Sequence, residues 1–206
     1  MDVVVNQHHE PGTGKVMAKI LAFTGSARKD SLNKKLLKIA AAGAAAAGAE
    51  VTLIDLADFE MPLFNQDLER EQGMPEKARE FKKLMSAHDG FLIASPEYNG
   101  AFSPLLKNTI DWASRSESDN EPPLVAYRGK TAAIMSTSPG GLGGMRGLLM
   151  LRMLLGNLGV IVLPDQQAVP NGFKVFNDDG SMNDDKLEKR IRTLGENLVG
   201  FTDKLK

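Results

Sequence analysis

The sequence predicts an α/β protein in which helices cover both faces of a five-stranded parallel β-sheet. Short apolar segments alternate with longer helical patterns from Lys19 onwards, and such alternation is typical of a parallel sheet. The apolar segments are hydrophobic almost throughout, as expected of strands buried on both faces. A length of 206 residues suits a single domain of this class.

Five apolar segments are the predicted strands. They span residues 20–24, 51–56, 90–94, 131–136 and 160–163. All are too short for typical helices, and length separates a buried strand from a buried helix where periodicity alone does not. We therefore expect the sheet to contain these five strands.

Five further segments are the predicted helices. They span residues 31–49, 75–87, 103–115, 145–158 and 186–206. The third has the clearest start, because Ser103 suits the N-cap and Pro104 suits the first helical position. The last carries apolar residues at helical spacing. Two long loops, residues 58–74 and 116–128, remain between these elements, and loops of this length are often functional.

The predicted domain spans residues 18–206, and residues 1–17 form an N-terminal extension. The extension contains Pro11-Gly-Thr-Gly-Lys15, which resembles the end of a phosphate-binding P-loop. The full motif needs a glycine where this chain has His9, and a serine or threonine where it has Val16. The segment also precedes the first strand instead of following one, so we interpret it as a lead-in without a nucleotide site.

Composition excludes several classes of function. A net charge of −1 argues against a dedicated nucleic-acid binder, which usually carries a basic excess. Cysteine is absent, which excludes disulfides, thiolate catalysis and iron–sulfur clusters. With only three histidines, a multi-histidine metal site is not expected. Neither a membrane span nor a signal peptide is recognisable, so we expect a cytoplasmic protein without a membrane partner.

The loop after the first strand has the composition of an anion site. Residues 25–33 read Gly-Ser-Ala-Arg-Lys-Asp-Ser-Leu-Asn and lead into a helix, whose N-terminal N–H groups attract anions. Serine and asparagine add neutral donors, and Arg28 adds a charged fork. A dinucleotide motif would contain three glycines, whereas this loop contains only Gly25, which favours a monophosphate. Alternatively, Ser31 only caps the helix and Arg28 is only solvated.

Two more loops follow strands that should end at the same edge, where open α/β sheets bind ligands. In residues 95–100, Ser-Pro-Glu-Tyr-Asn-Gly, Tyr98 offers a flat face to a ring. In residues 137–146, four glycines within five positions allow the backbone to approach a planar ligand. For the glycines, simple turn chemistry is an alternative explanation.

These three loops, together with Leu106-Lys-Asn-Thr-Ile-Asp-Trp112, resemble the NADPH-dependent FMN reductase family. That family includes quinone, chromate and azo-dye reductases and has a flavodoxin-like fold. The resemblance covers residues 18–165. It implies a three-layer sandwich whose five parallel strands are arranged in the order 2-1-3-4-5.

The resemblance also implies which residues bind FMN. The first loop would contact its phosphate through Ser26, Arg28, Ser31, Leu32 and Asn33. The second loop would contact the ribityl chain and isoalloxazine through Pro96, Glu97, Tyr98, Asn99 and Gly100. The third loop would lie near the pyrimidine end of the ring, at Ser138 and Gly140. Relatives often have Pro-Gly before the Leu-Lys-Asn helix, where this chain has Ser103-Pro104.

The expected function is that of an FMN-dependent oxidoreductase, which passes hydride from NADPH or NADH to a small acceptor: a quinone, free flavin, azo compound or chromate. FMN carries this chemistry, so neither a catalytic side chain nor a metal is required. The helix at 148–158 is apolar on every side, and the family is usually dimeric or tetrameric, so we expect a homodimer or homotetramer. The alternatives are a flavodoxin-type electron carrier without enzymatic activity and a WrbA-like flavin-binding scaffold.

Overall fold

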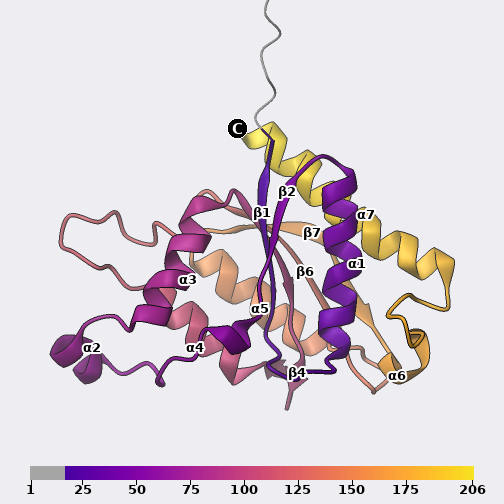
Figure 1. Ribbon diagram of the computed structural model, residues 1–206, viewed down its shortest axis with the longest axis horizontal. Coiled ribbons are helices and arrows are strands. Elements are labelled where there is room, and N and C mark those ends of the chain that lie inside the picture. Colours follow the sequence, from indigo (N-terminus) through magenta and orange to yellow (C-terminus); the bar gives the residue numbers. More distant parts are fainter. Residues whose placement is uncertain (1–16) are drawn as a thin grey trace, which may run out of the picture.

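The computed structural model describes residues 17–206, and these residues build the predicted five-stranded parallel sheet (Figure 1). Its strands are β1 (Lys19–Thr24), β2 (Glu50–Leu53), β3 (Gly90–Ala94), β6 (Thr131–Thr137) and β7 (Ile161–Val169). Their order is β2-β1-β3-β6-β7, which confirms the predicted order 2-1-3-4-5. The predicted N-terminal extension, with its Pro11–Lys15 motif, lies outside the described residues except for Met17.

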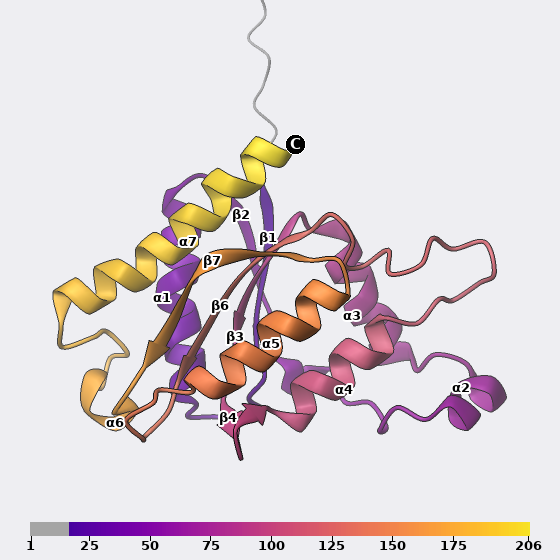
Figure 2. The same cartoon turned by 180° about the vertical axis from the view of Figure 1, so that it is seen from behind.

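Helices cover both faces of the sheet, as predicted. On one face lie α1 (Leu32–Ala46) and α7 (Asp185–Leu205), and on the other lie α3 (Glu76–Ala87), α4 (Pro104–Ala113) and α5 (Met145–Asn157). In Figure 1, α1 lies in front of the strands, and Figure 2 shows α5 in front of them from behind. The resulting three-layer, flavodoxin-like sandwich confirms the predicted fold class.

Each of the three central strands, β1, β3 and β6, contributes alternate residues to two separate hydrophobic cores. Ile20 and Ala22 of β1 pack with α1 and α7, whereas Leu21 and Phe23 pack with α3, α4 and α5. This division follows from the two-residue period of a strand, which sends successive side chains to opposite faces. It explains why the central strands lack a polar, solvent-facing side.

Close contact between α1 and α7 depends on two glycines. A Cβ atom on Gly43 would lie 2.1 Å from the Arg192 carbonyl oxygen, and one on Gly195 would lie 2.0 Å from the Ala40 carbonyl oxygen. The alanine-rich sequence of α1 lets the two backbones approach, and the packed pair then covers one face of the sheet.

Two predicted strand boundaries are wrong. The segment predicted at 51–56 leaves the sheet after Leu53, because Asp55 accepts a hydrogen bond from the Ala57 amide and starts the 3-10 helix η1 (Leu56–Asp58). The segment predicted at 160–163 continues to Val169 as β7. Polar residues are tolerated there because β7 is an edge strand, and Arg152 of α5 donates to the Leu163 carbonyl at 2.7 Å.

Besides η1, four short elements were not predicted. They are α2 (Gln66–Gln72), the hairpin strands β4 (Glu97–Tyr98) and β5 (Ala101–Phe102), and α6 (Gly172–Val175). The segment before α2 is fastened to α4, since Trp112 Nε1 and Asn108 Nδ2 both donate to the Pro62 carbonyl, at 2.7 and 2.9 Å. No helix within residues 17–206 is both long and apolar enough to cross a membrane.

Candidate functional site

The loops after β1, β3 and β6 meet at the carboxyl edge of the sheet and enclose a cavity of about 100 Å³. It is lined by Ser26, Arg28, Ser31, Leu32, Asn33, Pro96, Glu97, Tyr98, Thr137, Ser138 and Pro139. Typical ligand pockets measure roughly 300–1,000 Å³, so this cavity suits one end of a ligand. Of the predicted site residues, Asn99, Gly100 and Gly140 do not line it, while Thr137 and Pro139 were not predicted.

The first loop is positioned by the start of α4. Ser103 Oγ donates to the Gly25 carbonyl at 2.5 Å and accepts from the Leu106 amide at 3.2 Å, so the N-cap of α4 also holds the loop. A Cβ atom on Gly25 would lie 2.7 Å from that hydroxyl, which leaves no room for a side chain. Ser103, which departs from the family pattern, thus supports the loop after β1, the predicted phosphate loop.

Ser31 occupies the N-cap position of α1, but its side chain does not accept the backbone hydrogen bond that an N-cap residue usually accepts. Its backbone is extended at the start of α1, yet its side chain makes no cap hydrogen bond. The residue is only 4% exposed and lines the cavity. Its hydroxyl and the first N–H groups of α1 therefore face the place where the positive end of the helix dipole favours an anion. The alternative that Ser31 only caps the helix is not supported.

Arg28 lies on the exposed side of the same cavity, and Asn33 lies on the buried side. Asn33 Nδ2 donates to the Thr137 carbonyl, and Asn33 Oδ1 accepts from the Thr137 amide, both at 3.0 Å. These bonds join the start of α1 to the end of β6. The amide nitrogen keeps a second hydrogen, so a contact between Asn33 and the phosphate stays a prediction.

The second loop is a tight hairpin. Tyr98 pairs with Ala101, and the two residues between them have positive φ angles, +54° for Asn99 and +88° for Gly100. Asn-Gly is the preferred sequence for such a turn, so this dipeptide was a usable signal that sequence reasoning missed. The hairpin leaves Tyr98 47% exposed at the rim of the cavity, where its ring is accessible.

Glu97 fastens the hairpin to α5. Its side chain, 7% exposed, accepts from Arg146 Nε at 2.7 Å and from the Gly147 amide at 3.1 Å. Burial opposes its ionisation, but the hydrogen bonds from Arg146 and Gly147 outweigh burial and hold the pKa of Glu97 below its ordinary value. The carboxylate is committed to these partners, so its predicted contact with FMN remains a prediction.

The glycine-rich loop is fastened to the segment after β7. The Gly140 carbonyl accepts from the amides of Gly143 and Asn171, and the Gly172 amide donates to the Ser138 carbonyl. Gly144, the N-cap of α5, has a φ of +88°. The loop is thus shaped by its own turns and by backbone bonds, and Ser138 is the one of its two predicted residues that lines the cavity.

The cavity combines hydroxyl groups, helix N–H groups and one guanidinium, which together suit a phosphate monoester. No group of three or more His, Asp or Glu residues suited to a metal ion occurs among residues 17–206. The hairpin and the glycine-rich loop border the same edge of the sheet. The hairpin presents the aromatic ring of Tyr98, and the glycine-rich loop presents backbone without side chains. This arrangement can bind a phosphorylated molecule that carries a planar ring.

Comparison with known proteins finds matches among oxidoreductases. Residues 18–174 match the model of the family described as NADPH-dependent FMN reductase. The chain is 34% identical over 175 residues to an NAD(P)H-dependent FMN reductase of Pseudomonas aeruginosa, covering 84% of this chain and 89% of the relative. It is 34% identical over 193 residues to an NAD(P)H:quinone oxidoreductase of Solanum tuberosum, covering 91% and 94%.

A solved structure agrees with these sequence matches. FerB of Paracoccus denitrificans, described as a flavoenzyme NAD(P)H:(acceptor) oxidoreductase, superimposes on this chain with a TM-score of 0.76 at 29% identity. The superposition covers 91% of this chain and 98% of FerB. The similarity therefore extends over most of both chains.

Proposed function

This chain belongs to the NADPH-dependent FMN reductase family, and from that premise we propose that it reduces quinones with electrons from NADPH or NADH. Membership confirms the predicted class, an FMN- and NAD(P)H-dependent oxidoreductase. Quinones are proposed as acceptors because relatives along nearly the whole chain are described as quinone oxidoreductases. Free flavin, azo compounds and chromate are further acceptors to be tested, each by its own rate of reduction.

One observation of this structure carries the proposal. Ser31 is buried at the start of α1, lines the cavity, and leaves its hydroxyl unused by the helix. The hydroxyl is therefore available to donate to a phosphate oxygen beside the first N–H groups of α1. The residues present therefore fit the phosphate of FMN.

The chain's own residues would bind and orient the cofactor. Ser26, Ser31 and Arg28 would hold the phosphate, and Tyr98 and the glycine-rich loop would border the ring. Bound FMN would supply the hydride chemistry, which is the cofactor's own. Because Glu97, Arg146 and Asn33 are bonded to other protein groups, we assign them to positioning the loops.

Absorption spectroscopy tests the proposed function. Purified protein loaded with FMN should lose its flavin absorption when NADPH is added without oxygen, and regain it when benzoquinone follows. An electron carrier or a scaffold would keep its flavin oxidised with NADPH alone. Flavin released by heating should be FMN, and recovery of one FAD per chain would contradict the single phosphate loop.

We expect Arg28→Ala to weaken FMN binding about tenfold, or about 1.4 kcal/mol, because one charge-assisted contact to the phosphate is lost. This loss of binding free energy is at the lower end of the range for charge-assisted contacts, because Arg28 is exposed and solvent screens its charge. Fluorescence titration with FMN measures the change. Arg70→Ala, which removes an exposed arginine of α2, is the control and should bind FMN normally. Equal affinities for all three proteins would mean that Arg28 is only solvated.

We also propose a homodimer that buries the outer face of α5. Leu149, Met150 and Met153 of this helix are 58%, 45% and 62% exposed. A group of large apolar side chains on one helix is typical of an interface, and a second copy can pair with it by two-fold symmetry. Met153→Glu should therefore shift the mass measured by light scattering to that of a monomer. Leu205→Glu, a control on α7, should leave the mass unchanged. If Met153→Glu also leaves the mass unchanged, another face of the protein forms the contact.

A further inference from the structure

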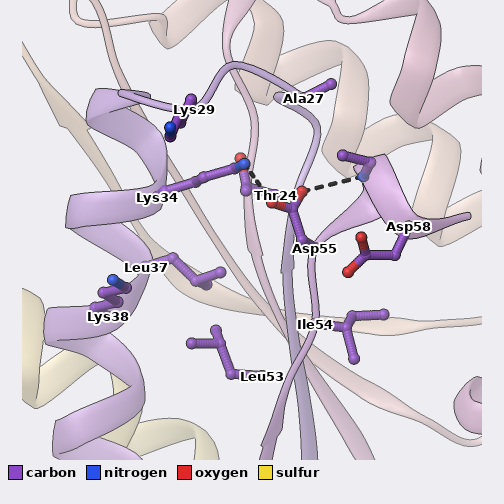
Figure 3. A pocket seen from close by; sticks show the side chains of 11 residues that line it. Thr24, Ala27, Lys29, Lys34, Leu37, Lys38, Leu53, Ile54, Asp55 and Asp58 are labelled. Carbon is purple, nitrogen blue, oxygen red and sulfur yellow. Dashed lines mark hydrogen bonds and ion pairs between the residues drawn. The ribbon is translucent and has the colours of Figure 1, made fainter.

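A larger groove lies on the opposite side of the phosphate loop (Figure 3). Its volume is about 640 Å³, and it opens where β1 and β2 end, between the first two turns of α1 and the 3-10 helix η1. Thr24 and Leu53, the last residues of the two strands, both line it. The groove is therefore at the carboxyl edge of the sheet, where open α/β sheets bind ligands.

Alternate residues of the loop after β1 line the groove and the smaller cavity of about 100 Å³, which we call the phosphate cavity. Ser26 and Arg28 line the phosphate cavity, whereas Ala27 and Lys29 line the groove. The two spaces are thus separated by the thickness of one loop. A molecule in the groove would lie beside the cofactor without displacing its phosphate.

One wall of the groove carries three lysines, Lys29, Lys34 and Lys38, of which one has an acidic partner. Lys34 is paired with Asp55 across the groove (Figure 3). Burial opposes ionisation of Asp55, but its bonds with Lys34 and the Ala57 amide hold its pKa below the ordinary value. By contrast, Lys29 and Lys38 line the groove but form no hydrogen bond or ion pair within residues 17–206. Two ammonium groups are therefore available to an anion.

The floor of the groove is apolar. Leu37 of α1 is buried, and Leu53, at the end of β2, is 48% exposed (Figure 3). Ile54 also lines the floor, and Asp58 lies on the wall opposite the lysines. A planar ring system of a ligand would cover the side chain of Leu53 and remove it from water. The groove thus combines two sites, one for an anion on the α1 wall and one for a planar ring system below it.

We propose that this groove binds the adenosine 2′-phosphate end of NADPH and favours NADPH over NADH. The inference rests on the proposed function, since NADPH differs from NADH only by this phosphate. Lys29 and Lys38 bind the 2′-phosphate, and the adenine covers Leu53 and Ile54. The nicotinamide end of the same extended molecule lies at the neighbouring flavin site, which opens at the same edge of the sheet.

Binding of adenosine 2′,5′-bisphosphate to the FMN-loaded protein, measured by calorimetry, tests the inference without turnover. The wild type should bind this probe about tenfold more tightly than adenosine 5′-diphosphate, because two lysines contact the 2′-phosphate. Lys29→Ala and Lys38→Ala should each weaken binding of the bisphosphate about tenfold and leave binding of the 5′-diphosphate unchanged. Lys35→Ala is the matched control, because Lys35 is also on α1 but does not line the groove.

Steady-state kinetics provides a second measurement. Lys29→Ala and Lys38→Ala should raise the KM for NADPH about tenfold and leave the KM for NADH unchanged. The inference is wrong if both variants behave like Lys35→Ala, if both nucleotides lose affinity equally, or if inorganic phosphate alone displaces the bisphosphate at similar concentration. Failure of the wild type to oxidise either nicotinamide would instead overturn the proposed function, and the calorimetric result would still decide whether the groove binds a 2′-phosphate.

Discussion

Gly144→Ala is expected to destabilise the protein by about 3 kcal/mol and to abolish normal FMN binding. Gly144 has a φ of +88°, which L side chains rarely adopt. A Cβ atom would also lie 1.8 Å from Ser136 Oγ and 2.7 Å from Ser136 Cβ, in a fully buried position. The start of α5 must therefore shift, and with it the glycine-rich loop and the Arg146 contact to Glu97.

Urea unfolding and FMN titration measure this effect against a control in the same loop. A Cβ atom on Gly141 would meet no other atom within 4 Å, and Gly141 has no positive φ. Gly141→Ala should therefore change stability by less than about 0.5 kcal/mol. Adding Ser136→Gly to Gly144→Ala should restore part of the stability, because it removes the clashing atoms. Equal stability of both alanine variants would show that Gly144 is not constrained by Ser136.

Asn33→Ala is expected to destabilise the protein by about 3 kcal/mol. The substitution leaves the amide and the carbonyl of Thr137 without their side-chain partner, and Thr137 is buried. An unpaired buried polar group costs about 1–3 kcal/mol, and two are created here. FMN should also bind more weakly, since the first and third loops lose the bonds that hold them together.

Chemical denaturation is the measurement, and Asn197→Ala is the control because Asn197 is exposed on α7. Asn33→Ala should lower the midpoint, while Asn197→Ala should stay close to the wild type. If Asn33→Ala lowers FMN affinity without lowering stability, then Asn33 acts mainly on the phosphate, as the family resemblance implied.

The sequence by itself determined the class of fold and the position of the loops that matter. Five apolar segments separated by helical patterns specify a parallel sheet, because strands covered on both faces must be apolar throughout. The loops at 25–33 and 95–100 were recognisable because donors and turn residues are local in sequence. Ser103 and Pro104 likewise predicted the start of α4, which the structure confirms. Each of these signals comes from residues that are close together in sequence, so it can be interpreted without the tertiary structure.

Tertiary structure decided the features that depend on residues distant in sequence. Asn33 and Thr137 are separated by 104 positions, so neither residue alone indicates that the first and third loops are joined. The length of β7 depends on its place at the edge of the sheet and on Arg152, which hydrogen-bonds its carbonyl groups. The groove beside the phosphate loop combines lysines near the start of α1 with the exposed end of β2. Contacts of this kind arise only when packing of the two cores brings separate segments together, because the free energy of burial does not depend on separation along the chain.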